Sequence, residues 1–181
     1  MKATGVSRRL DDLGRIVIPK EIRRNLRIRE GTPMEIFTDR EGGIILRKYS
    51  PIGELSTFAE QYAEVLSQST GHVVCILDKE QVIAVSGGSK KELLNQPLSY
   101  KMEEVIEERS LVVEESKSKN YQKLSEQEGD FSVEVIAPIL CQGDAIGAVV
   151  ILAKEKKKEN MEVEKKLATT AAAFLGKQME Q

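Results

Sequence analysis

The first fifty residues alternate short apolar runs with turn-forming residues, a pattern typical of short strands around one helix. Asp39 to Gly43 supply the aspartate and glycine residues of a hairpin turn between two of these runs. Pro19 suits the first turn of a helix, because the N–H that proline lacks would have no partner there. The pattern predicts a helix over 20–26 and strands over 6–10, 15–18, 34–38 and 44–48.

Beyond residue 50 the apolar residues recur at helical spacing, and later they form runs typical of buried strands. The hydrophobic pattern predicts terminal helices over 52–69 and 160–179, short helices over 90–95 and 101–108, strands over 72–78 and 81–88, and a hairpin of 133–140 with 145–153. The order of helix, strands, helices, strands and helix indicates an α+β sheet domain flanked by its terminal helices.

A long polar stretch, residues 115–130, interrupts this pattern without any apolar period. Loops of this length are uncommon, and they are usually either functional or disordered. We expect disorder here in preference to a lid over a ligand.

The charge is distributed unevenly along the 181 residues, whose formal net charge is -2. Residues 1–50 carry 12 Lys and Arg against 7 Asp and Glu, whereas residues 51–181 carry 15 against 22. Such asymmetry favours two domains, one of which binds a polyanion. We predict a first domain over 1–50, a linker and helix start over 51–55, and a second domain over 56–181. Fifty residues bury little apolar surface, so we expect an obligate dimer.

Seven arginines lie within residues 7–31. On a helix over 20–26, with about 100° per residue, Ile22 and Leu26 share the side suited to a core, and the basic residues of 20–27 share the other. Arginine grips phosphate through two hydrogen bonds and can also bind guanine, which favours duplex DNA as the partner. The residues predicted to contact DNA are Arg8, Arg9, Arg15, Lys20, Arg23, Arg24 and Arg27.

The alternative is a solvated, salt-bridged surface, in which Asp11, Asp12, Glu21 and Glu30 neutralise several of the arginines. We favour DNA, because like charges crowded onto so small a fold repel one another unless a polyanion offsets them.

The run "DDLGRIVIPKEIRRNLRIREGTPMEIF" (11–37) resembles the swapped-hairpin DNA-binding domain of AbrB-type transition-state regulators, with "LGRIVIPKEIRR" as a specific signature. The resemblance covers 1–50 almost without a gap. It implies that two chains interleave their hairpins into one β-barrel dimer. It also implies DNA contacts by Arg8, Arg15, Arg23 and Arg24, with Arg9 beside them.

The second half, notably "VSGGSKKELLNQPLS" (85–99) and "PILCQGDAIGAVVI" (138–151), resembles the GAF-like domain that sporulation regulators of spore-forming Firmicutes carry after this DNA-binding domain. The resemblance implies a nucleoid-associated transcription factor that activates and represses promoters in the forespore, on AT-rich DNA. It also implies a homotetramer. The apolar stripes of 52–69 and 160–179 favour a helical bundle between chains, the alternative being that they cover their own sheet.

GAF-like domains bind various small molecules or none, and the cyclic-nucleotide signature is absent here. Glycine-rich backbone ahead of a helix can bind an anion, so Ser86, Gly87, Ser89 and Lys90 form a candidate site. We prefer a plain turn and helix cap, and we expect no cofactor.

We predict that the protein is not an enzyme. Cys75 lies in an apolar run, Cys141 adjoins a turn, and the single histidine, His72, has no evident catalytic partner. No run of about 18 apolar residues predicts a membrane span, and we expect a cytoplasmic protein. Two other functions stay open: a swapped-hairpin antitoxin that neutralises a toxin, and a GAF-fold methionine sulfoxide reductase.

Overall fold

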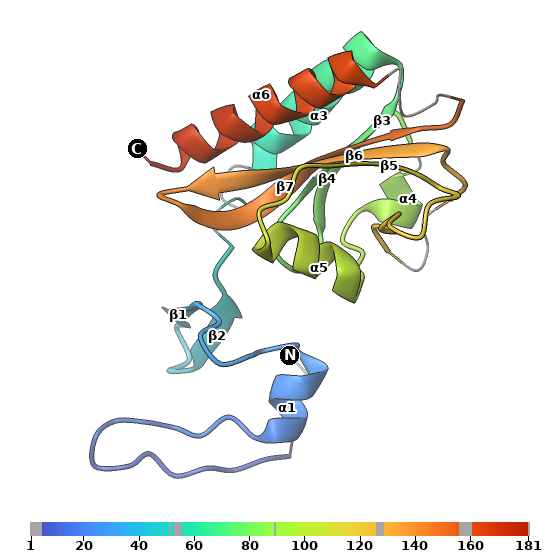
Figure 1. The fold of residues 1–181 in the computed structure, drawn as a ribbon. Coiled ribbons are helices and arrows are strands. Elements are labelled where there is room, and N and C mark those ends of the chain that lie inside the picture. Colours follow the sequence, from blue (N-terminus) through green and yellow to red (C-terminus); the bar gives the residue numbers. More distant parts are fainter. Residues whose placement is uncertain are drawn as a thin grey trace. The chain divides into compact units, whose positions relative to one another are not determined.

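The computed structural model describes residues 5–50, 52, 56–88, 90–125, 129–155 and 161–180. It divides into two compact units, Met1–Tyr49 and Ser50–Gln181. Figure 1 shows the helices and strands of both. No helix among the described residues is both long and apolar enough to cross a membrane.

The N-terminal unit contains one short helix and one hairpin, as the sequence predicts. Helix α1 (Lys20–Asn25) follows Pro19, and strands β1 (Met34–Thr38) and β2 (Ile44–Lys48) pair antiparallel. Asp39 closes the hairpin turn, since its carboxylate accepts hydrogen bonds from the backbone N–H groups of Glu41 and Gly43.

The strands predicted over 6–10 and 15–18 are absent from the structure, and this prediction is wrong. The two stretches are joined by a turn, in which the N–H of Gly14 donates to the carbonyl of Asp11. A strand is defined by its ladder of hydrogen bonds to a neighbour, and within the chain these stretches form no such ladder. Alternating apolar residues alone therefore do not make them strands.

The described residues of the N-terminal unit include none that is buried. The large apolar side chains that lie exposed on this unit are Val6, Leu10, Leu13, Ile16, Val17, Leu26, Ile36, Phe37, Ile44 and Leu46. The expectation that fifty residues bury little is thus confirmed for one chain.

The C-terminal unit is built on a five-stranded antiparallel sheet of order β4-β3-β7-β6-β5. The strands are β3 (Val73–Leu77), β4 (Val82–Ser86), β5 (Val112–Glu115), β6 (Val133–Cys141) and β7 (Asp144–Ala153). The predicted α+β domain is confirmed. Strand β5 was not predicted, because it is short and two of its four residues are acidic, so it forms no apolar run in the sequence.

Helices cover both faces of this sheet (Figure 1). The helices are α3 (Ser56–Thr70), α4 (Lys90–Leu93), α5 (Tyr100–Glu107) and α6 (Glu162–Gln178). Small and apolar residues on α3 and α6 pack against one face, and residues of α4 and α5 pack against the other. Both terminal helices are confirmed within the described residues, while 51, 53–55 and 156–160 lie outside them.

The polar stretch 115–130 is held to the domain through Leu124, whose side chain is fully buried. The carbonyl of Leu124 accepts a hydrogen bond from the N–H of Ser99 at 3.0 Å, and the hydroxyl of Ser99 donates to the carbonyl of Lys123 at 2.6 Å. The expected disorder is therefore wrong for residues 116–125, whereas residues 126–128 lie outside the described part.

Candidate nucleic-acid interface

No residue of helix α1 is buried, so its basic side chains are open to solvent. Lys20, Arg23 and Arg24 lie on the helix, and all three are exposed. Ile22 is half-buried, in agreement with its predicted position on the inner side. Leu26, predicted for the same side, is 55% exposed, because the helix ends at Asn25 before reaching it. The helix therefore keeps one apolar contact inward and directs its cations to solvent.

Arg27 lies beyond the helix, in contrast to the arc of 20–27 that the sequence suggested. Its φ of 51° is left-handed, and the N–H of Ile28 donates to the carbonyl of Arg23 at 2.7 Å. This hydrogen-bond pattern terminates a helix. Arg27 consequently lies outside the helix, on left-handed backbone, and it is exposed.

The turn before the helix is organised by Asp11. The carboxylate Oδ2 of Asp11 lies 2.8 Å from Nε of Arg15, and Oδ1 accepts the backbone N–H groups of Leu13 at 3.0 Å and Arg15 at 2.7 Å. Hydrogen bonds from the Arg15 backbone and then its side chain hold the pKa of Asp11 below the ordinary value of 3.8. The sequence counted Asp11 among several neutralising acids, and the structure pairs it with Arg15.

The remaining predicted cations keep their charge uncompensated. Arg8 donates to the adjacent carbonyl of Ser7, at 2.9 Å, and forms no ion pair with a described residue. Across the described residues we find no ion pair to any of Arg9, Lys20, Arg23, Arg24 and Arg27. The alternative of a fully salt-bridged surface thus applies to Arg15 alone among the predicted DNA contacts.

A second candidate site lies in the C-terminal unit, in a cavity of about 440 Å³. It is lined by Gly71, His72, Val73, Gly87, Leu152, Lys154 and Glu155. Of the predicted anion site, Gly87 alone lines it; Ser86 ends β4, Lys90 begins α4, and Ser89 lies outside the described residues.

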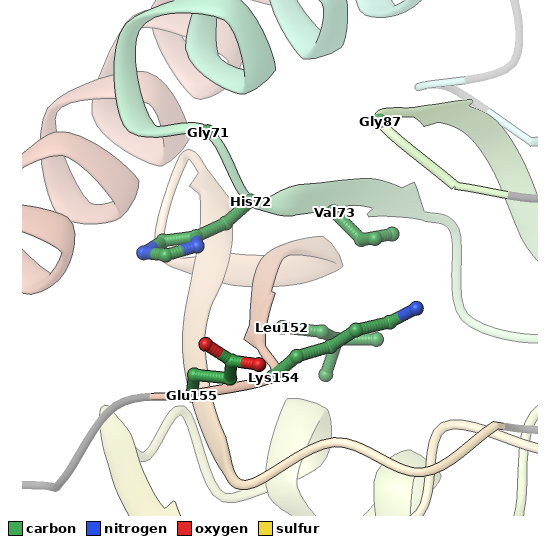
Figure 2. Close-up of a pocket in the computed structure, with 7 residues that line it drawn as sticks. All are labelled: Gly71, His72, Val73, Gly87, Leu152, Lys154 and Glu155. Carbon is green, nitrogen blue, oxygen red and sulfur yellow. The ribbon is translucent and has the colours of Figure 1, made fainter.

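Two polar side chains that line this cavity, His72 and Lys154, do not converge. Figure 2 shows the ring of His72 and the ammonium of Lys154 pointing in opposite directions. Nζ of Lys154 lies 6.0 Å from the ring centre of Phe131. The anion site stays a prediction, which a thermal-shift measurement with inorganic phosphate would test.

His72 has a partner that sequence reasoning missed. Its Nε2 lies 3.4 Å from Oε1 of Glu164 on α6, and both side chains are largely buried. The contact joins the start of β3 to a helix far along the chain, and no local sequence pattern predicts it. Since it links two packed elements, we interpret the pair as structural.

Neither cysteine supports catalysis. Cys75 has no exposed surface, so its thiol cannot reach a substrate, and Cys141 is half-buried. Over the described ranges, no cluster of three or more His, Cys, Asp or Glu side chains could hold a metal ion.

Comparison with known families assigns each half of the chain. Residues 54–180 match the family described as stage V sporulation protein T C-terminal, transcription factor. Residues 8–54 match the family described as antidote-toxin recognition MazE, bacterial antitoxin. The antitoxin match covers the N-terminal unit and its junction, while the rest of the chain belongs to the folded sheet domain.

Curated relatives extend the match to the whole length. The chain is 54% identical to stage V sporulation protein T of Bacillus subtilis (strain 168), over 100% of both chains. It is also 39% identical over 95 residues to the transition state regulatory protein AbrB of the same organism, which covers 52% of this chain and 96% of AbrB. The AbrB-like character of the N-terminal half is thereby confirmed.

Solved structures confirm the GAF fold of the C-terminal half. A type II free methionine-R-sulfoxide reductase from Thermoplasma acidophilum superposes with a TM-score of 0.55 at 15% identity, covering 71% of this chain and 94% of that one. A GAF domain from an Acinetobacter phosphoenolpyruvate-protein phosphotransferase gives 0.53 at 14% identity, covering 71% and 87%. At such identities the likeness concerns the fold alone. The chain belongs to the family of stage V sporulation protein T, transcription factors rather than enzymes, in which an AbrB-like domain precedes a GAF-like one.

Proposed function

We propose that this chain binds double-stranded DNA through its N-terminal unit and regulates transcription during sporulation. The observation that carries the proposal is the set of exposed cations on and beside α1 that no acidic side chain neutralises within the described residues. The family supports it, since its members are described as transcription factors.

The chemistry of these cations suits a DNA backbone. Arg23 and Arg24 form no ion pair among the described residues, and each guanidinium can bind a phosphate through two parallel hydrogen bonds. Phosphate contacts position a protein on DNA without reading its sequence. The DNA-binding set remains that of the sequence analysis, with AT-rich promoters as targets, where DNA shape contributes to selection.

The functional unit in this proposal is a dimer formed by residues 1–50. Exposed apolar side chains such as Leu10, Val17 and Ile36 support it, because isolated chains of this size rarely leave so many large apolar groups in water. In a swapped-hairpin arrangement, the stretches 6–10 and 15–18 would pair with the partner chain and become strands. Two copies of the basic surface would then face one duplex.

A tetramer completes the proposed assembly, through the helices that the sequence placed over 52–69 and 160–179. Phe58 and Val65 on α3 and Val163 on α6 are 48%, 60% and 65% exposed. The rings of Tyr62 and Phe174 stack across the two helices at 5.2 Å, which joins them into one apolar surface. The same pair of helices from a second copy would cover that surface as a bundle.

In the cell we place this regulator in the forespore cytoplasm, on the nucleoid, where it activates some late promoters and represses others. These assignments follow the resemblance to sporulation regulators. Chromatin immunoprecipitation of the protein from sporulating cells, which measures its occupancy of promoters, would test them.

The test of DNA binding is a salt series on an AT-rich promoter duplex. If a dimer engages about six to eight phosphates, log affinity should fall against log salt with a slope of roughly -5 to -7. Arg23→Ala/Arg24→Ala should bind more weakly and with a shallower slope. The matched control, Lys117→Ala/Lys119→Ala, removes two exposed positive charges from the C-terminal unit and should leave both quantities unchanged.

The opposite outcome has a definite meaning. Binding that is insensitive to salt, or absent, would show that the arginines serve another partner. The antitoxin function, favoured by the match over residues 8–54, would then be tested by copurification of a stoichiometric toxin.

A further inference from the structure

The predicted DNA-binding residues form a basic surface: Arg8, Arg9, Arg15, Lys20, Arg23, Arg24 and Arg27. Within it, the turn at Asp11 is distinctive because both oxygens of an acidic side chain accept hydrogen bonds there. Both carboxylate oxygens of Asp11 accept hydrogen bonds, and the donors are the N–H groups of Leu13 and Arg15 and Nε of Arg15. The backbone adds two more bonds, from the N–H of Asp11 to the carbonyl of Arg15 at 3.0 Å and from Gly14 to the carbonyl of Asp11. Asp11 thus fixes both the backbone and the side chain of Arg15.

This engagement has two consequences for the guanidinium of Arg15. Its Nε edge is occupied, while the side chain is 71% exposed, so the pair of terminal nitrogens faces solvent. A guanidinium is a rigid planar fork, so holding one edge sets the direction of the other donors. The adjacent carboxylate also offsets part of the attraction that Arg15 would otherwise exert on a phosphate.

Arg15 therefore differs chemically from Arg23 and Arg24. Those side chains form no ion pair among the described residues, and they attract phosphates of any sequence. A compensated, oriented guanidinium adds little to that attraction, but it keeps directional donors for the acceptor atoms of a base edge. Asp11 itself is 37% exposed and repels phosphates that approach in a wrong register.

We propose that Asp11 is a specificity-determining positioning residue, which aims Arg15 at a base edge and lowers the affinity for DNA of other sequences. The inference rests on the proposed DNA binding of the N-terminal unit. Hydrogen bonds from Arg15 keep the pKa of Asp11 low, so the carboxylate is charged at neutral pH.

The chain offers a matched pair of substitutions. Asp11→Asn keeps an oxygen that can accept the two backbone N–H groups, so the turn survives, but it removes the charge and the ion pair with Arg15. Asp12→Asn removes one charge from the adjacent exposed residue, which forms no hydrogen bond or ion pair within the described residues. The pair separates positioning from net charge.

The experiment measures the full-length chain on two duplexes. One is the duplex that wild type enriches most strongly from a randomised pool, and the other is a scramble of the same length and composition. Asp11→Asn should bind the scramble a few-fold more tightly, and its specificity ratio should fall about tenfold. Asp12→Asn should bind both duplexes slightly more tightly with an unchanged ratio.

The double variant Asp11→Asn/Arg15→Ala links the effect to Arg15. If Asp11 acts through Arg15, the ratio of the double variant should equal that of Arg15→Ala. Equal ratios for wild type and Asp11→Asn, with the turn shown intact by amide NMR, would overturn the inference. If wild type binds no duplex at all, the proposed function itself fails, an outcome distinct from equal ratios.

Discussion

Single residues of the basic surface differ in what surrounds their charge. Arg15 lies against a carboxylate, Arg23 and Arg24 lie in solvent on a helix, and Arg27 lies on left-handed backbone at that helix's end. An exposed ion pair contributes little to stability, so the value of the Asp11–Arg15 contact lies in orientation. Arginine thus occurs on this surface in three different local surroundings.

The titration of Asp11 is the prediction at this scale. Its folded pKa lies below the unfolded value, so the stabilisation of the turn is present above the unfolded pKa and is lost as pH falls through the folded one. An NMR titration should give a midpoint below 3.8, with the amides of Leu13 and Arg15 shifting at the same pH. Arg15→Ala should raise this midpoint, though not fully to 3.8, because the backbone hydrogen bond remains. A wild-type midpoint above 3.8 would contradict the described turn.

Helix α6 approaches the sheet closely at Gly176, near its C-terminal end. Gly176 of α6 is buried, and a Cβ atom added there would collide with the backbone carbonyl oxygen of Leu140 on β6. Ala168, Ala171 and Ala172 of the same helix are buried in the core on this face of the sheet. Small side chains therefore set how near the terminal helix approaches its sheet.

Gly176→Ala should destabilise the C-terminal unit for this reason. The obstacle is backbone rather than a flexible side chain, so overpacking of about 1–3 kcal/mol should outweigh the helix propensity of alanine, worth about 1 kcal/mol. Denaturant unfolding measures the difference. Gly129→Ala is the control, because its nearest neighbour, a ring carbon of Phe131 at 3.9 Å, is at ordinary contact distance. Equal stability of the two variants would contradict the close approach.

The whole molecule combines one unit in which no described residue is buried and one with two apolar layers. The N-terminal unit can reach an ordinary degree of burial by pairing with a second copy. The C-terminal unit is already packed. Among its described residues, the exposed large apolar side chains on α3 and α6 are Phe58, Val65, Val163 and Phe174, while Tyr100, Leu111 and Leu140 are exposed elsewhere. In the proposed assembly the N-terminal unit buries its apolar side chains by dimerising. The C-terminal unit is already folded and associates with a second copy to form the tetramer.

Charges placed on the helical surface should therefore change mass but not folding. Val65→Glu/Val163→Glu should shift the chain from tetramer to dimer in sedimentation equilibrium, since each glutamate would lose its hydration in a bundle. The control Gln68→Glu adds charge at an exposed polar position of α3 and should remain tetrameric. A wild-type dimer, or a tetrameric double variant, would argue against association through these helices.

Several elements were predictable from sequence because their signals are local. The hairpin of β1 and β2 carries its own turn residues, and β6 and β7 are long apolar runs around a two-residue turn. The resemblance to AbrB-type domains was also local, carried by one uninterrupted run of residues. Arginine density likewise needs no structure to be noticed.

Other features depend on residues that are distant in sequence. Strand β5 exists because β6 offers it a ladder, and Leu124 is ordered because its carbonyl meets Ser99. The stretches 6–10 and 15–18 have the composition of strands, but composition cannot provide the strand they would pair with.

The sequence by itself determined the division into two domains, the α+β class of the second and a basic N-terminal surface, since periodicity, turn chemistry and charge are properties of neighbouring residues. The AbrB-like and GAF-like folds came from the resemblance of particular runs of residues to known families. Only the tertiary structure decided which acid meets which base. It paired Asp11 with Arg15, joined His72 to Glu164, and turned Arg27 out of the helix. Such choices depend on distances of a few ångströms, which backbone geometry sets after the chain has folded.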